Sequence, residues 1–429
     1  MELRADSKSL NESNLFLRAL WAELRRICGK CDWQYTPSKD GKAKRIFLGF
    51  ADIGRPEGVL DVSVLYVQRG TINSICFAFA NGVPVPRESA LGKLLIQIVQ
   101  AAKTIMSSPT LRSYETTIEA LRLSPSFYKG QSFRITPRSK RWFSLAITVA
   151  CFDETDARTQ LIPRMRRMLD VLSVETNSAF WPGQNKTPEE DEPLASNVKR
   201  EVVVHDPDWM DDYPIHDGLF LISAQGKRLL QAVAKEETLV EPIATFTRAC
   251  NHFHTARKYH AQIWDVLELG APERTEQAEE HVVSVNVRNS RLEAAGQVGA
   301  AHAEITGTLY MSALEVASKI GAAEPEPCPQ CGQPRYRISQ RVTDLMTKHG
   351  GPKLGQLAKA YYSDRSKYLH EGIMLSDSSY AGVSIPLLDP SGPTGCRTQT
   401  ASPSPNLQEY TGFCMRRVLK EIVNREANA

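Results

Sequence analysis

Long hydrophobic runs, a strong net charge and a regular cysteine pattern are all missing from this sequence of 429 residues. No apolar run approaches the roughly 20 residues that a membrane-spanning helix needs, and the polar residues 1–8 do not resemble a secretion signal. We therefore expect no membrane association and a cytoplasmic location. The nine cysteines are odd in number and scattered, so we expect most to be reduced. The net charge of +3 is mild, which means that any nucleic-acid-binding surface must be local.

The first 182 residues mix the two periodicities that distinguish helices from strands. Apolar residues recur at helical spacing in three segments, and strand-like runs include a hairpin around Arg69 and Gly70. The helical segments are 14–28, 88–107 and 156–172, and the strand-like segments are 59–80 and 142–152. Because both kinds of element occur within one stretch, we predict an α+β domain over residues 1–182, with a sensor or targeting role as its working hypothesis.

Helical periodicity dominates the remainder of the chain. Residues 183–199 are acidic, contain proline and show no period, and a linker or surface loop is predicted over residues 183–218. The chain is longer than one hydrophobic core usually covers, and residues 219–429 predict a second domain that is an all-α bundle. A stretch rich in Ser, Gly, Pro and Thr, 376–405, predicts a long loop within it. The predicted helices are 229–234, 239–266, 292–320, 335–347, 354–374 and 407–423.

Arginine and histidine pairs with four to six residues between them offer a guanidinium and an imidazole, two groups suited to phosphate chemistry without a metal. The four such pairs are Arg200 with His205, Arg248 with His254, Arg274 with His281, and Arg365 with His370. About two accidental matches are expected in a chain with nine histidines, so the context must select among them.

The local sequence favours the last pair. Arg200 belongs to a strand-like run, and Arg274 lies among carboxylates that would repel a phosphate, so we interpret both of these pairs as accidental. The pair of Arg248 and His254 lies on a predicted helix and is the second choice. Arg365, by contrast, occupies a position on the apolar stripe of its helix, where a core residue is expected.

A charge on the apolar stripe has two explanations. In the structural one, Arg365 forms a buried ion pair with Glu315, or its guanidinium stacks on Tyr361 or Tyr368. In the functional one, Arg365 acts on a phosphate together with His370. The sequence leaves both explanations open at this point.

The functional explanation fits attack by an RNA 2′-hydroxyl on the adjacent phosphodiester. An imidazole, with an ordinary pKa of about 6.5, accepts the proton of the nucleophile and, when protonated, donates one to the leaving oxygen. A guanidinium stabilises the phosphorane-like transition state without a metal. Residues five apart point about 140° apart around a helix, so a site that uses both favours two helices related by a twofold axis. Ser366 lies one turn before His370 and would orient the imidazole.

Four segments in order resemble the Apea-like HEPN domains of prokaryotic defence proteins. They are LYMSALEVASKIG from Leu309, CPQCG from Cys328, YRISQRVTDLM from Tyr336 and YYSDRSKYLHEG from Tyr361. The resemblance is close over residues 309–372 and looser over the rest of the helical half. It implies a HEPN-like bundle and a metal-independent endoribonuclease that serves as an abortive-infection effector against phage.

By the same resemblance, Arg365 and His370 are the catalytic pair of a homodimer that cleaves RNA, responds to a phage-derived trigger and needs no cofactor for catalysis. The residues expected to support the pair are Ser366, Asp364, Tyr368 and Glu315. The alternative function is a HEPN module that dimerises and binds a nucleic acid or nucleotide within a defence complex without cleaving it.

Two further groups of residues are candidate metal sites. Cys328 and Cys331 have the spacing of half a zinc knuckle, and a tetrahedral site needs two more ligands. Cys28 and Cys31 share that spacing in the other domain, and Cys396 and Cys414 are single and distant in sequence. We take a structural zinc at Cys328 and Cys331 as a hypothesis, with a pair of reduced thiols as the alternative.

The second group is a histidine cluster on one predicted helix. His252 and His254 point to different faces, and His260 lies six residues beyond His254. We therefore expect histidines that are satisfied by their surroundings and not a shared metal site.

Overall fold

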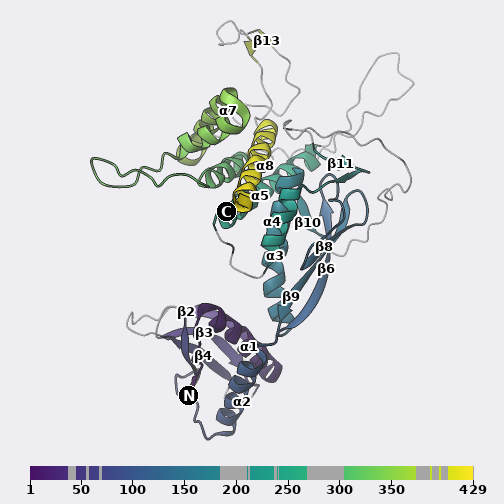
Figure 1. Ribbon diagram of the computed structural model, residues 1–429. Helices are drawn as coiled ribbons and strands as arrows, with labels where there is room; N and C mark the ends of the chain where they lie inside the picture. The colour runs from purple at the N-terminus through teal and green to yellow at the C-terminus, as the bar shows by residue number, and fades with distance from the viewer. Residues whose placement is uncertain are drawn as a thin grey trace. The chain divides into compact units, whose positions relative to one another are not determined.

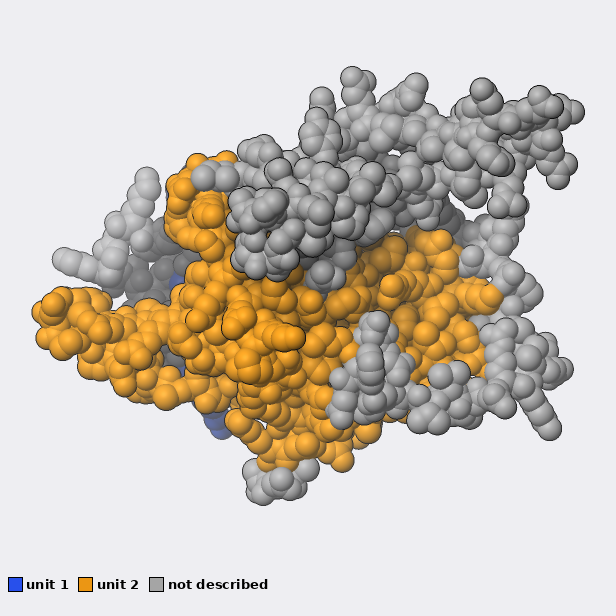
Figure 2. Space-filling model, turned by 90° about the horizontal axis from the view of Figure 1, so that it is seen from above, with its two compact units in different colours: residues 1–114, 148–162 blue, residues 115–147, 163–429 orange. Residues whose placement is uncertain are grey.

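The chain folds into two compact units that combine helices with antiparallel sheets. The computed structural model describes residues 1–36, 45–54, 58–66, 70–183, 210, 213–235, 239, 241–267, 304–372, 387–388, 396–397 and 404–428. One unit comprises Met1–Tyr114 with Thr148–Ile162, and the other comprises Glu115–Ile147 with Pro163–Ala429; Figure 2 colours them separately. The α+β class predicted for the N-terminal part, followed by a largely helical C-terminal part, is confirmed at this coarse level.

A five-stranded sheet forms the base of the first unit. Its strands are β1 (Glu2–Arg4), β2 (Lys30–Thr36), β3 (Arg45–Asp52), β4 (Val59–Tyr66) and β5 (Ile72–Phe79), in the order β1-β5-β4-β3-β2. All neighbours are antiparallel, and Val62 of β4 lies opposite Phe77 of β5. Leu60, Val62 and Val64 are buried because alternate residues of a strand face the same side. The hairpin predicted over residues 59–80 is confirmed.

Two helices, α1 (Leu10–Cys28) and α2 (Ala90–Ile105), pack against each other and share a hydrophobic core with this sheet (Figure 1). Ser9 caps the N-terminus of helix α1, and its hydroxyl accepts a hydrogen bond of 3.1 Å from the Glu12 N–H. The helix ends where Gly29 adopts a φ of +83°, a conformation that glycine tolerates best. The observed helix starts four residues before the predicted start at residue 14, because the apolar pattern begins only after the cap and first turn.

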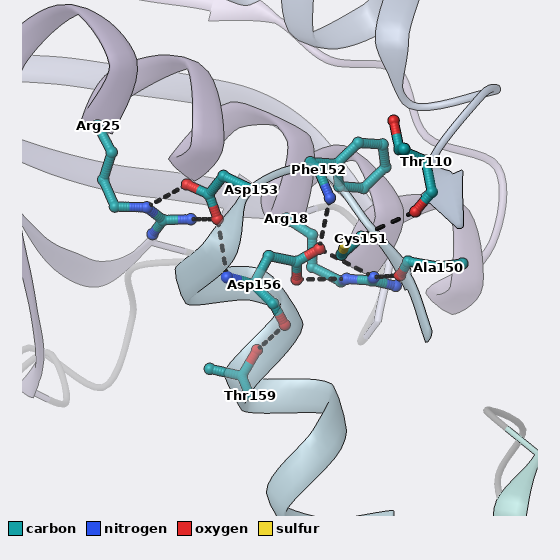
Figure 3. A network of polar contacts seen from close by, with 9 residues as sticks. All are labelled: Arg18, Arg25, Thr110, Ala150, Cys151, Phe152, Asp153, Asp156 and Thr159. Carbon is teal, nitrogen blue, oxygen red and sulfur yellow. Dashed lines mark hydrogen bonds and ion pairs between the residues drawn. The ribbon is translucent and has the colours of Figure 1, made fainter. Parts of the chain in front are cut away.

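A polar network connects α1 to the start of α3 (Glu154–Thr176) within the first unit (Figure 3). Arg18 donates to both carboxylate oxygens of Asp156, at 2.8 and 3.0 Å, and the Phe152 N–H also donates to Asp156. Arg25 donates to both oxygens of Asp153, at 2.6 and 2.9 Å. Asp153 also accepts a hydrogen bond of 2.7 Å from the Asp156 N–H, so it caps the N-terminus of α3.

Asp153→Ala is expected to destabilise the first unit by about 1–2 kcal/mol, because it removes a helix cap and a partly exposed ion pair. Burial acts to raise the pKa of Asp153, but the Arg25 guanidinium and the Asp156 N–H outweigh it and hold the pKa below its usual range. The stabilisation is therefore complete above the ordinary carboxyl pKa and is lost as the pH falls through the lowered one. Urea unfolding of the wild-type, Asp153→Ala and Asp153→Asn proteins, from neutral pH down to the lowered pKa, measures this loss of stability. Asparagine keeps the helix cap and removes the charge, so it separates the two contributions. Equal stability of all three proteins at neutral pH would contradict it.

The second unit contains most of another five-stranded sheet. Its strands are β6 (Thr110–Ala120), β7 (Tyr128–Lys129), β8 (Phe133–Pro137), β9 (Trp142–Cys151) and β10 (Phe180–Pro182), in the order β10-β6-β9-β8-β7. Strands β6 and β9 each continue into residues of the first unit. This division differs from the predicted domains 1–182 and 219–429, because residues 115–147 and 163–182 group with the helical part. Long-range bonds account for the difference: Asn177 donates to both oxygens of Glu409 at 2.8 Å, although 232 residues separate them.

The helices of the second unit are the part of α3 from Pro163 onward, α4 (Ala224–Ala234), α5 (Ile243–Leu267), a helix described over 304–317, α7 (Ile338–Glu371) and α8 (Ser404–Asn428). Helix α8 packs against α4, α5 and α7 (Figure 1). These elements confirm that the predicted helices exist, but α5 begins at Ile243 and not at residue 239, α7 begins at Ile338 and not at residue 335, and residues 318–320 form a turn. Short strand pairs also occur, β11 (Ile215–His216) with β12 (Leu219–Phe220) and β13 (Leu387–Leu388) with β14 (Cys396–Arg397), so residues 219–429 are not purely helical. Most of the predicted linker 183–218 and loop 376–405 lies outside the described residues.

Candidate functional site

The segment that carries Arg365 and His370 is the second half of a kinked helix. Inside α7, Gly351 has a φ of +84° and is followed by Pro352, so the two helices predicted over 335–347 and 354–374 meet at this kink. Proline suits the first position of a new helix, where its missing N–H is not needed. Helix α7 ends at Gly372, which has a φ of +70° and donates a hydrogen bond of 3.2 Å to the Tyr368 carbonyl.

Arg365 forms an ion pair with Glu315 of the helix over 304–317. The Arg365 Nη1 to Glu315 Oε1 distance is 2.9 Å, and Nη2 donates to Oε2 at 3.3 Å. The two side chains are 20% and 15% exposed. The guanidinium carbon also lies 5.6 Å from the ring centroid of Tyr362. The ion pair of the structural explanation is therefore present, while the neighbouring ring belongs to Tyr362 and not to Tyr361 or Tyr368.

The ion pair leaves part of the guanidinium available. Arginine has five N–H donors, and Glu315 faces both terminal nitrogens of Arg365. The Arg365 Nε is buried and makes no hydrogen bond to the described residues. The guanidinium is therefore partly accessible to an anion, since the Arg365 side chain is 20% exposed, and Glu315 fixes the direction in which it points.

His370 lies in the last turn of α7 and is exposed. Within the described part of the chain, no hydrogen bond joins it to Ser366, the residue that was expected to orient the imidazole. Asp364, Ser366 and Tyr368 are each partly buried on the same helix. The structure therefore places all the predicted residues on two neighbouring helices, but it brings Arg365 to Glu315 and not to His370.

The separation of Arg365 and His370 follows from helix geometry. Five residues advance the helix by about 7.5 Å and turn it by about 140°, so the two side chains diverge. One copy of α7 cannot direct both groups at one phosphate. A site that uses both requires a second copy, and this geometric requirement is the same one that the sequence predicts.

The second-choice pair, Arg248 and His254, does not form a site. Arg248 is exposed and forms an ion pair of 2.8 Å with Glu241. His254 is 1% exposed; its Nε2 accepts a hydrogen bond of 3.0 Å from the Phe180 N–H, and its Nδ1 lies 2.7 Å from Asp170 Oδ1. Because Nε2 is the acceptor, Nδ1 carries the proton and donates it to Asp170. The other two pairs, Arg200 with His205 and Arg274 with His281, lie outside the described residues.

Two of the three histidines of α5 have hydrogen-bond partners, as was predicted for all three: His254 bonds Asp170, and His260 lies within 3.4 Å of Arg257 and Tyr310. Burial lowers the pKa of His254, although the hydrogen bond that it donates to Asp170 opposes this shift, and the ring is neutral because Nε2 accepts from the Phe180 N–H. Burial and the charge of Arg257 lower the pKa of His260 to about 3. Burial also lowers the pKa of His252, and the carboxylate of Glu315 acts against it. His252 therefore lies near the ion pair of Arg365, a neighbour that the sequence spacing did not reveal.

Cys328 and Cys331 lie on a tight turn between the helix over 304–317 and α7. The Gly332 N–H donates to the Cys328 carbonyl at 2.8 Å, and Gly332 has a φ of +71°. Arg335 Nη2 donates to Cys328 Sγ at 3.2 Å, a contact that the sequence analysis missed. Hydrogen bonds from the backbone of Gln330 and Cys331, and then from Arg335, lower the pKa of the Cys328 thiol to about 7.

In the metal-free, reduced protein, alkylation of Cys328 by iodoacetamide is expected to rise with pH through about 7, because the thiolate is the reactive form. Cys31 is the matched control. Burial, followed by the charge of Cys28, raises its pKa to about 12, so it is expected to react slowly at neutral pH. Mass mapping of the alkylated peptides at several pH values measures both rates. Equal labelling of the two cysteines at pH 7 would contradict the assignment.

The described residues contain neither a metal-ligand cluster nor a helix that could span a membrane. No three His, Cys, Asp or Glu side chains come together there as a group that could hold a metal ion. None of the described helices is long and apolar enough to cross a membrane. The site therefore consists of the Arg365–Glu315 ion pair, the exposed His370 and, separately, the pair of cysteines.

Comparisons with known proteins add no relative. No protein-family model, no curated protein and no solved structure matches this chain. The resemblance to Apea-like HEPN domains thus rests on the four segments within residues 309–372 alone.

Proposed function

We propose that this protein is a metal-independent endoribonuclease of HEPN type, in which Arg365 and His370 from two copies of α7 act on one RNA phosphodiester. The protein would act in the cytoplasm as an abortive-infection effector, with a phage-derived trigger and the N-terminal α+β region as its sensor. The observation that carries the proposal is the combination of a fixed, partly accessible Arg365 with an exposed His370 on the same helix.

Each residue has a defined task in this proposal. His370 accepts the proton of the 2′-hydroxyl, and the protonated His370 of the other copy protonates the departing 5′ oxygen. The 2′ oxygen forms a bond to phosphorus, the bond to the 5′ oxygen breaks, and a 2′,3′-cyclic phosphate results. Arg365, held by Glu315, donates to the phosphoryl oxygens as their negative charge increases. Glu315 is a positioning residue.

A substrate series tests this chemistry. Oligonucleotides with a single ribonucleotide, the matching 2′-O-methyl nucleotide or the deoxynucleotide at the same position are incubated with the protein in excess EDTA. Protein is taken from phage-challenged and unchallenged cells, because an effector of this kind is expected to need its trigger. Only the substrate with a free 2′-hydroxyl is expected to be cut. Cleavage of the 2′-O-methyl or all-deoxy strand would rule out this mechanism.

The Arg365–Glu315 ion pair also favours a second candidate function. A partly buried charge pair between two helices serves the fold without any chemistry, and the protein would then be a dimerising module that binds a nucleic acid or nucleotide. The two candidates differ at His370, which is exposed and forms no ion pair with any residue that the structure describes. A binding module is expected to keep its full function in His370→Ala, whereas the nuclease loses it.

A further inference from the structure

An arm over residues 321–337 joins the helix over 304–317 to α7 (Figure 1). Apart from the partly buried Cys328, all its residues are exposed, so no hydrophobic core holds it. Its chain runs out and back, with Pro327 and Pro334 bridged and the Arg335 N–H donating to the Glu326 carbonyl at 2.9 Å. Ordering so many exposed residues has a large entropic cost, which a few hydrogen bonds do not offset.

The end of the arm has the geometry of a metal knuckle. The Cys328 N–H donates to the Gln333 carbonyl at 2.7 Å, and the Gly332 N–H donates back to the Cys328 carbonyl at 2.8 Å. This turn brings the thiols of Cys328 and Cys331 to the same end, where both are accessible. Two thiolates at this spacing make half of a tetrahedral zinc site.

We propose that Cys328 and Cys331 of two copies of this chain together bind one Zn²⁺, so that the arms of a dimer are joined at their ends by a four-thiolate site. This assignment goes beyond the proposed nuclease activity and does not depend on it. The bound metal would also stabilise the folded arm, which has no hydrophobic core of its own.

Three observations point to a second copy as the source of the missing ligands. The described residues provide no third His, Cys, Asp or Glu beside the two thiols. The arm is exposed along its length, so an identical arm can approach its end. A zinc ion with four thiolates has a net charge of −2, and two copies of Arg335, each 3.2 Å from a Cys328 sulfur, balance that charge. A twofold axis through the metal supplies the two missing thiolates, brings the exposed ends of the arms together and places one Arg335 on each side of the metal.

The test measures metal stoichiometry on the full-length protein. Reduced protein purified with Zn²⁺ is expected to contain one zinc for every two chains by elemental analysis. Native mass spectrometry should find zinc in dimers and not in monomers. Titration of the metal-free protein with Co²⁺ should saturate at half an equivalent, with the absorption of a tetrahedral four-sulfur site. Cys328→Ser and Cys331→Ser are expected to lose the metal, whereas Cys396→Ser and Cys28→Ser keep it.

Circular dichroism provides the folding control, because the arm is exposed and Cys328→Ser should leave the helical signal and melting temperature of the bundle unchanged. Zinc bound to a monomer, saturation at one equivalent, loss of the metal in Cys396→Ser, or no metal uptake by reduced protein would each overturn the shared site. RNA cleavage is not a readout in this experiment. A failure here therefore leaves the nuclease proposal untouched, and a failure of the nuclease assays leaves the zinc site untouched.

Discussion

His370→Ala is expected to lower the rate of RNA cleavage by about 100- to 10,000-fold, the range that general acid–base catalysis contributes. Arg365→Ala is expected to lower it at least as far, because charge on the phosphoryl oxygens then has no fixed donor. The measurement is the single-turnover rate on a defined RNA in excess EDTA. Lys367→Ala is the matched control, since Lys367 is an exposed cation on the same helix. It is expected to cleave at the wild-type rate.

His370→Ala tests catalysis with less effect on protein stability than Arg365→Ala. Its side chain is exposed, so its removal should change the free energy of unfolding by less than about 0.5 kcal/mol. Arg365→Ala, in contrast, leaves the carboxylate of Glu315 partly buried without its partner, and some loss of stability is expected. Activity that is retained in a well-folded His370→Ala protein would argue for the binding module, whatever Arg365→Ala does.

Asp170→Ala is expected to destabilise the second unit by about 3 kcal/mol, the largest stability effect that we predict. Asp170 is buried and accepts hydrogen bonds of 2.9 Å from Asn251 and 2.7 Å from His254. Its removal leaves the buried His254 N–H without its acceptor, whereas the exposed Asn251 amide can still donate to water. Because His254 also accepts from the Phe180 N–H, its ring cannot turn to a new partner without losing that bond.

Urea unfolding followed by far-ultraviolet circular dichroism measures this loss. Two transitions are to be fitted if the two compact units unfold separately. Asp170→Asn keeps the size and one acceptor and should lose less, while Asp344→Ala removes an exposed carboxylate and should change stability by less than about 0.5 kcal/mol. A loss below about 1 kcal/mol in Asp170→Ala would mean that the network contributes little.

The elements of this fold could be predicted from local sequence where the pattern itself is local. Alternating apolar residues in β4 and β5 identified the hairpin, and the helical period identified α1, α2 and α3. The domain boundaries could not be found this way. They depend on contacts between distant residues, such as Asn177 with Glu409, which no window of a single sequence contains. The sheet of the second unit was therefore assigned to the first domain.

The candidate site could be predicted only in part, for a similar reason. Arg365 could be selected because it places a charge on an apolar stripe. Its partner Glu315 could be suggested because it lies in the predicted helix that starts at Leu309 in the family resemblance. The choice among Tyr361, Tyr362 and Tyr368 as the adjoining ring depends on side-chain rotamers, which spacing does not determine. The nearness of His252 to Glu315 depends on how α5 packs against the helix over 304–317, which periodicity alone does not specify.

The most direct test of the central claim is the chemistry of the RNA ends that the protein produces. Total RNA is incubated with protein from phage-challenged cells in excess EDTA, and the 3′ ends of the fragments are mapped. The proposed attack by the 2′-hydroxyl predicts 2′,3′-cyclic phosphate ends with wild-type protein and no such ends with the double variant Arg365→Ala, His370→Ala. Fragments with 3′-hydroxyl ends, or the same cyclic ends from the double variant, would contradict it.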